Sequence, residues 1–348
     1  MSKIETSKIN TLKIDTSLMF DPVRVGAMAA ELEAVGFDGA YTFEGQNDPF
    51  ISLAAAAMNS QRMELMTSIA VAFARNPMSL AYQANDLQLL SGGRFILGLG
   101  TQVKAHIVRR FNMPWSKPAA RMREMVRAIK AIWESWETGD RLQFEGEFYR
   151  HTLMSPTFSP GANPHGTPKI YIAGVGPLMT QVAAEVGEGL FVHPFHTPES
   201  LARVTLPAVQ SGLDSAGKQR SDFDIAAQAI TVTGLNEEQL AAAEFSARSQ
   251  IAFYASTPAY LPVLAVHGWE ALQLEANRLS KEGKWAEMAA LIDDDMLHTF
   301  AVIGEPAQVA QKLMQRFDGK VERVSPVIYS ADTALLSTLL EEIRALQG

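Results

Sequence analysis

The sequence predicts a (β/α)8 TIM barrel, because eight short apolar runs alternate with helical segments along most of the chain. The length of 348 residues suits one domain of this class, although length alone would also allow two. Residues 64–103 support the barrel further, because they form one complete strand, helix, strand unit. A doubly wound open sheet is the second possibility. We therefore predict a single barrel domain over residues 1–348, with a helical insertion at 237–300.

The central unit shows how each element is predicted. Residues 65–73 are an almost unbroken apolar run, which is typical of a parallel strand buried on both faces. Asn76 can cap the next helix and Pro77 fits its first position. Residues 91–93 end that helix, and residues 94–99 form a second buried strand. The apolar face of the helix consists of Leu80, Ala84 and Leu87.

The flanking elements follow the same rhythm. On the N-terminal side we expect a strand at 13–19, a helix from Asp21-Pro22 to Gly36, a strand at 38–44 and a helix opened by Asp48-Pro49. On the C-terminal side the expected strands are 169–173, 189–193, 223–233 and 321–329, and the expected helices are 117–137, 177–186, 201–213, one opened by Glu305-Pro306, and 333–346. Residues 142–151 are expected to form a hairpin outside the barrel.

Composition limits the function classes. The net charge of -8 without a basic run argues against nucleic acid or an anionic membrane surface as the main partner. The absence of cysteine excludes disulfides, thiolate metal sites and a cysteine nucleophile. The first residues lack the apolar segment of a signal peptide and no apolar stretch is long enough to span a membrane, so we expect a cytoplasmic protein. No H-E-x-x-H or G-x-S-x-G motif occurs, and we expect no metal.

Two side chains are catalytic candidates because of their position. Active sites of such barrels lie at the C-terminal ends of the strands. Glu44 ends the second strand, where it can transfer a proton or bind substrate, although a solvated loop acid is the alternative. His193 ends the sixth strand, where a packing role is as plausible as catalysis.

Glycines at two neighbouring strand ends point to a phosphate. Gly174-Val175-Gly176 precedes a helix N-terminus, where backbone N–H groups and the helix dipole favour an anion. A tight turn that needs glycine for its backbone is the alternative. Residues 98–101 repeat the arrangement one strand earlier, so we expect a large phosphorylated cofactor across this side. Four aromatic residues of the insertion are expected either to line the pocket or to pack inside the insertion. They are Tyr254, Tyr260, His267 and Trp269.

The central unit resembles the bacterial luciferase-like superfamily of flavin and deazaflavin oxidoreductases. The likeness is most specific in SGGRFILGLG, residues 91–100, and extends to Asp38-Gly39 with Glu44, to residues 169–176 and to the helix at Glu305-Pro306. This resemblance implies a (β/α)8 barrel that binds FMN or coenzyme F420 at its C-terminal mouth. The runs AVAFARNP, GLGTQV and FYASTPAY are similar to the F420-dependent branch.

The resemblance also implies site residues. The strand through Thr67 and Ser68 should carry a non-proline cis peptide bulge behind the deazaflavin ring, and Glu44 should face the ring. The residues that should hold the phosphate-bearing tail are Gly100, Thr101, Gln102, Gly174, Val175 and Gly176. Gly45 stands where many relatives have a histidine, which leaves Glu44 or His193 as the candidate acid.

These inferences lead to one main functional prediction and two alternatives. The first is hydride transfer between coenzyme F420 and a small organic substrate, with the insertion covering the site. The second is an FMN-dependent monooxygenase, which would need reduced flavin from a separate reductase. The third is a ligand-binding barrel without turnover. Superfamily members are often dimers, so we also expect a homodimer.

Overall fold

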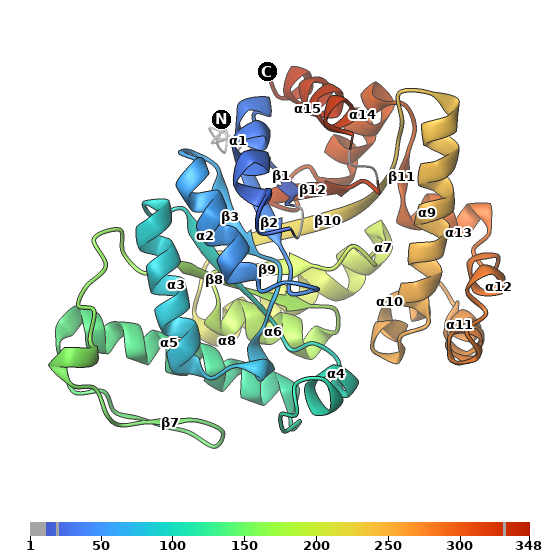
Figure 1. Ribbon diagram of the computed structural model, residues 1–348. Helices are drawn as coiled ribbons and strands as arrows, with labels where there is room; N and C mark the ends of the chain where they lie inside the picture. Colours follow the sequence, from blue (N-terminus) through green and yellow to red (C-terminus); the bar gives the residue numbers. More distant parts are fainter. Residues whose placement is uncertain (1–11, 19–20, 330–331) are drawn as a thin grey trace, which may run out of the picture.

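The computed structural model describes residues 12–18, 21–329 and 332–348. Within them, eight parallel strands form a closed barrel (Figure 1), and the last strand of the barrel pairs with the first. In barrel order the strands are β1 (Lys13–Ser17), β2 (Gly39–Thr42), β3 (Glu64–Thr67), β5 (Phe95–Gly100), β8 (Lys169–Gly174), β9 (Gly189–Val192), β10 (Asp224–Val232) and β12 (Arg323–Val327). The predicted TIM barrel is therefore confirmed, and the open sheet is wrong.

Helices surround this barrel. They are α1 (Val25–Val35), α2 (Pro49–Asn59), α3 (Pro77–Ser91), α5 (Pro118–Thr138), α6 (Pro177–Val186), α8 (Leu206–Ala216), α14 (Pro306–Phe317) and α15 (Thr333–Gln347). The predicted caps are present, because Asp48 accepts from the Phe50 N–H at 2.9 Å and Asn76 accepts from the Ser79 N–H at 3.0 Å. The hairpin is β6 (Phe144–Glu145) with β7 (Arg150–His151).

The structure departs from the predicted elements in three places. The run 65–73 is divided into β3, β4 (Ala70–Val71) and the 3-10 turn η1 (Ala72–Ala74), since the chain bulges at residues 68–69 toward β2. The first helix begins at Val25 rather than Asp21, because the Asp21 side chain accepts from the Val23 N–H and forms a turn. Several short elements were not predicted, among them α4 (Lys104–Arg109), α7 (Pro198–Ser200) and β11 (Val302–Ile303). Met19, the predicted end of the first strand, lies outside the described residues.

The insertion is helical and follows β10. Its elements are α9 (Glu237–Ala255), η5 (Pro258–Tyr260), α10 (Leu261–Ala265), α11 (Glu270–Glu282), α12 (Trp285–Ala289) and α13 (Asp294–Phe300). These helices lie together at the right of the barrel in Figure 1. Phe195, just past β9, stacks on Phe300 with ring centroids 4.5 Å apart, so the insertion is fastened to the barrel beside the sixth strand.

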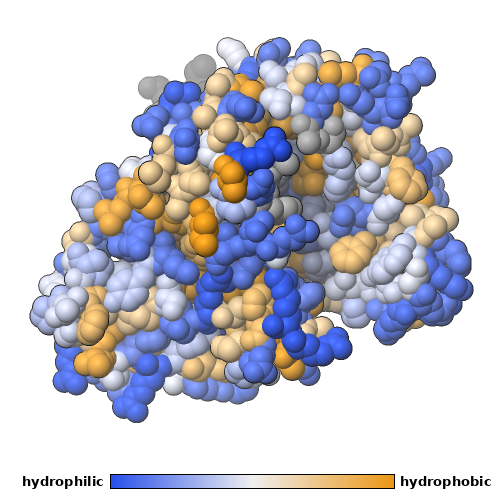
Figure 2. All heavy atoms as spheres, viewed as in Figure 1, coloured by the Kyte–Doolittle hydropathy of each residue, from blue (hydrophilic) through white to orange (hydrophobic). Residues whose placement is uncertain are grey.

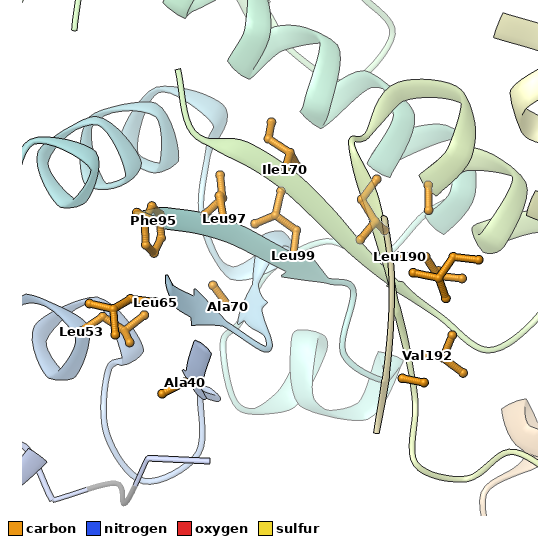
Figure 3. Packing of buried hydrophobic residues seen from close by; sticks show 14 of the residues in the cluster. Ala40, Leu53, Leu65, Ala70, Phe95, Leu97, Leu99, Ile170, Leu190 and Val192 are labelled. Atoms are coloured by element: carbon orange, nitrogen blue, oxygen red, sulfur yellow. The ribbon is translucent and has the colours of Figure 1, made fainter. Parts of the chain in front are cut away.

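The main core lies between the barrel strands and the helices. Leu97 and Leu99 of β5 and Ile170 of β8 are fully buried there (Figure 3). The Met and Trp residues of α5 belong to this core, as predicted from their spacing. A smaller apolar cluster fills the barrel interior with Tyr41, Met66, Ile96, Tyr171, Phe191 and Ala226. No helix in the described part of the chain is long and apolar enough to cross a membrane.

Charged side chains close the N-terminal end of the barrel. Arg323, which is 2% exposed, contacts both carboxylate oxygens of Asp15 at 2.6 and 2.8 Å and also pairs with Glu64. Lys13 reaches Glu64 at 2.7 Å. Burial alone would raise the pKa of Glu64, but Arg323 and Lys13 hold it below its ordinary value. This end is thus occupied by ion pairs, and the open C-terminal end is left for function.

Candidate active site at the C-terminal mouth of the barrel

The bulge after β3 has a cis peptide bond between Ser68 and Ile69, as the resemblance implied. The buried Thr67 hydroxyl donates to the Gly98 carbonyl and accepts from the Gly98 N–H, both at 2.8 Å. Gln228 of β10 donates to the Ser68 hydroxyl oxygen at 3.3 Å from across the barrel. The Thr67 hydroxyl therefore makes its hydrogen bonds to β5. The part of the bulge that can contact a ligand at the mouth is its backbone.

The glycines of β5 are required by this bulge. A Cβ at Gly98 would lie 1.7 Å from the Thr67 carbonyl oxygen, and one at Gly100 would lie 2.7 Å from the Ile69 side chain. Beyond them, the Thr101 hydroxyl donates to the Gln102 carbonyl at 3.0 Å, and Gln102 has a φ of 58°. Close packing against β3 and the bulge thus explains glycine at positions 98 and 100 without a cofactor. A cofactor contact at residues 100–102 stays a prediction.

The turn between β8 and α6 can hold a phosphate. A Cβ at Gly176 would meet nothing within 4 Å, so its backbone is open to a ligand. The first N–H groups of α6 have no partner within the helix, and the helix dipole makes this end positive. Gly174 and Val175 line a narrow pocket together with His193 and Phe195. The predicted phosphate-binding residues therefore lie beside His193, and their backbone fits an anionic group.

Glu44 is engaged in an ion pair. Its carboxylate accepts from the Val71 N–H at 2.7 Å and pairs with Arg75, which also pairs with Asp48 at 2.8 Å. The Glu44 N–H donates to the Ile69 carbonyl at 3.0 Å. Glu44 thus supports the bulge through both its backbone and its side chain. A catalytic role for Glu44 stays a prediction, and structural support of the bulge is the alternative role.

His193 lies at the end of β9 under the insertion. Burial lowers the pKa of His193 to about 3, so its ring is neutral at physiological pH. Nδ1 accepts from the Phe195 N–H at 3.1 Å, and Nε2 lies 3.3 Å from the Tyr260 hydroxyl oxygen. The Tyr254 ring meets it edge-on, with centroids 4.6 Å apart. The ring therefore joins the strand end to the insertion.

The four aromatic residues singled out in the insertion separate into two pairs. Tyr254 and Tyr260 reach His193, whereas His267 stacks on Trp269 at 4.5 Å and bonds Thr197 at 2.8 Å. The second pair thus packs the insertion against the loop after β9. Figure 2 shows the surface hollowed between the barrel and the insertion.

Sequence reasoning missed two tyrosines at the mouth. The Tyr41 hydroxyl of β2 lies 3.1 Å from the Ser325 hydroxyl of β12. Tyr329 follows β12, and its side chain is 36% exposed. The positional rule that selected Glu44 could have found Tyr329, which follows the eighth strand. Among the described residues, no cluster of three or more His, Asp or Glu side chains is arranged to hold a metal ion.

Comparison with known proteins agrees with this architecture. The luciferase-like monooxygenase family model matches residues 7–323, and the chain therefore belongs to this family. An uncharacterized protein of Mycobacterium tuberculosis is 46% identical over 333 residues, which are 96% of this chain and 98% of that protein. An F420-dependent glucose-6-phosphate dehydrogenase of Intrasporangium calvum is 28% identical, with 86% of each chain covered. Family membership supports an oxidoreductase.

A solved structure shows the same fold. The coenzyme F420 dependent tetrahydromethanopterin reductase from Methanopyrus kandleri superposes with a TM-score of 0.77. The match covers 95% of this chain and 97% of that one at 20% sequence identity. At this identity the likeness establishes the fold and leaves the cofactor to be argued from the site.

Proposed function

We propose that the protein is an F420-dependent oxidoreductase that transfers hydride between coenzyme F420 and a small organic substrate. The observation that carries this proposal is the backbone-lined mouth formed by the bulge at residues 68–69, the β5 glycines and the open turn at 174–176. A mouth of this kind lets a planar ring and a phosphate approach the main chain closely. F420-dependent proteins among the relatives and structural neighbours support the choice of cofactor.

Different residues would hold the phosphate and the ring of the cofactor. Gly174, Val175 and Gly176, with the N-terminus of α6, would hold the phosphate, and residues 100–102 would lie beside it. The bulge at residues 67–69 would back the ring. F420, when bound, supplies two-electron hydride chemistry, while the protein orients the reactants and excludes water. The insertion covers the mouth on the β9 and β10 side, where the substrate would enter.

An FMN-dependent monooxygenase is the second candidate, because the matching family model is that of luciferase-like monooxygenases. A backbone-lined mouth accepts either tricyclic ring, so the phosphate site alone does not separate the two. Such a monooxygenase would use molecular oxygen together with reduced flavin that a separate reductase supplies. Cytoplasmic location, a homodimer and the organisation of residues 1–348 as one domain likewise stay predictions.

Titration of the purified protein with F420 and with FMN tests the proposal. We expect saturable F420 binding, followed by fluorescence, and weaker FMN binding. Gly176→Asp should weaken F420 binding at least about tenfold, because it brings a carboxylate to the phosphate, whereas Gln311→Glu adds the same charge on the exposed face of α14 and should leave affinity unchanged. Tight FMN binding without F420 binding would reverse the ranking.

The variant Glu44→Gln distinguishes a supporting role of Glu44 from a role as the general acid. The amide can still accept from the Val71 N–H but loses the charge that pairs with Arg75. We expect weaker F420 binding, with turnover at saturating F420 reduced less than about tenfold. General acid catalysis is worth roughly 10²- to 10⁴-fold, so a loss of that size at saturation would make Glu44 the proton donor.

A further inference from the structure

A positively charged segment crosses the rim of the barrel mouth. Residues 87–123 contain no Asp or Glu, although the whole chain has a net charge of -8. We call residues 101–110 of this stretch the α4 segment, and its cations are Lys104, Arg109 and Arg110. Strongly hydrophilic side chains cover the surface around α4, below the hollow between barrel and insertion (Figures 1 and 2). The positive charges are therefore concentrated on one exposed element near the mouth.

The two ends of the α4 segment place it over the bulge. The segment follows β5 directly, and the Arg110 guanidinium donates to the Gly45 carbonyl, just past β2, at 3.0 Å. Because β3 lies between β2 and β5 in the barrel, the segment spans the end of β3, where the chain bulges. Ile107 is fully buried and fixes α4 to the core. The exposed side of α4 therefore borders the opening through which a ligand would approach the bulge.

The cations of the α4 segment are not neutralised by partners. Within the described part of the chain, the exposed side chains of Lys104 and Arg109 make no hydrogen bond or ion pair. Arg110 contacts a backbone carbonyl and the Phe111 ring, but none of the described carboxylates. Six helical residues span about 9 Å, which is less than the Debye length of about 10 Å at 0.1 M salt. The three charges therefore add to one positive local potential.

The neighbouring carboxylates do not cancel this potential. Glu44 and Asp48, on the β2 side of the mouth, both pair with Arg75. Glu147 of the hairpin pairs with Lys117 at 2.7 Å. Each of these acids already shares a cation, whereas the α4 segment offers cations without acids. An organic anion would thus be attracted to this part of the rim and repelled by the acidic remainder of the surface.

We propose that the α4 segment is an electrostatic entrance, which attracts organic anions with two or more charges and brings the phosphate-bearing cofactor to the mouth. The identity of this anion as F420 rests on the proposed function, whereas the positive potential does not. The anion encounters the exposed cations first and then moves to the turn at residues 174–176, so the segment acts on association and not on the final complex. Such steering raises association rates by roughly 10- to 10³-fold and weakens with salt.

A single introduced thiol can report this potential without cofactor, because the chain has no cysteine. Ala105→Cys places the thiol on the exposed surface of α4. Its reaction rate with dithiobis(nitrobenzoate), a dianion, is divided by its rate with dithiodipyridine, which is uncharged. Both reagents react with the thiolate, so the ratio cancels changes in the thiol pKa. We expect Arg109→Glu to lower this ratio at least about fivefold at roughly 10 mM salt and to have little effect at roughly 1 M salt. An unchanged ratio at low salt would overturn the proposal.

Arg141→Glu is the matched control for Arg109→Glu. Arg141 is exposed and has no ion pair within the described residues. It follows α5, whose 21 residues span about 30 Å, whereas α4 precedes that helix, so the two sites are far apart. The same change of charge at Arg141 should alter the ratio less than about 1.5-fold. A loss equal to that of Arg109→Glu would mean that the net charge of the protein, and not the α4 segment, determines the potential.

Stopped-flow binding of F420 distinguishes an entrance from a binding site. We expect Arg109→Glu to slow association at least about tenfold at low salt, with dissociation changed less than about twofold, and we expect the difference from wild type to vanish at high salt. Faster dissociation with unchanged association would make Arg109 a ligand of the bound cofactor and would overturn the entrance. Absence of F420 binding by the wild type would instead remove the proposed function, while the thiol measurement would still decide the potential.

Discussion

Gly98→Ala is expected to lower the free energy of unfolding by about 3 kcal/mol or more, at the upper end of the range for overpacking. The new Cβ would lie 1.7 Å from the Thr67 carbonyl oxygen, and a backbone atom cannot move aside as a flexible side chain does. Relief requires β3 and β5 to separate at the bulge. Urea unfolding followed by circular dichroism measures the loss.

Two other glycines provide a graded control for Gly98→Ala. The new Cβ of Gly100→Ala would first meet the Ile69 side chain, at 2.7 Å, which can move more easily than a backbone atom, so the expected loss is smaller. Gly176→Ala has open space and an ordinary φ of -88°, so its stability should stay within about 0.5 kcal/mol of wild type. Equal stability of the Gly98 and Gly176 variants would show that the bulge does not press on β5.

Arg323→Met is expected to lower the free energy of unfolding by roughly 3–5 kcal/mol at neutral pH. Methionine keeps most of the volume but leaves Asp15, which is 3% exposed, and Glu64 without their shared cation. Arg203→Met is the matched control, because its pair with Glu199 is exposed and should contribute less than about 1 kcal/mol. A loss no greater than that of the control would mean that the ion pairs are not structural.

The cost of Arg323→Met should depend on pH. The folded pKa of Glu64 is below its ordinary value of 4.5, so its ion pairs stabilise the protein above that value. This contribution disappears as the pH falls through the folded pKa. The stability difference between wild type and variant is therefore expected to narrow below about pH 4.5. A difference that widens in acid would contradict the assigned charges.

The local elements could be predicted because their signals lie close together in the chain. Asn76 and Pro77 open α3, and Gly92 ends it with a φ of 65°. The residue pattern alone did not predict the division of the run 65–73, since its residues stay mostly apolar and the break depends on contacts with Thr42 of β2 and with Glu44 just past it. Only the resemblance to the luciferase-like superfamily implied a bulge there. Short-range sequence patterns predict the alternation of strands and helices, but not the places where neighbouring strands come into close contact.

The candidate site was predicted only in part for the same reason. The positional rule for barrels drew attention to Glu44 and His193, but their partners lie far away in the sequence. Glu44 meets Arg75 after one crossover, and His193 meets Tyr260 across the start of the insertion. The meeting of Tyr41 with Ser325 requires the barrel to close. Which hydroxyls gather at the mouth is thus set by the tertiary fold.

A crystal structure of the protein with F420 bound tests the central claim most directly. We predict that the deazaflavin ring lies against the bulge at residues 68–69, with the phosphate at Gly174–Gly176. A ring bound elsewhere, or a phosphate distant from the N-terminus of α6, would contradict the account.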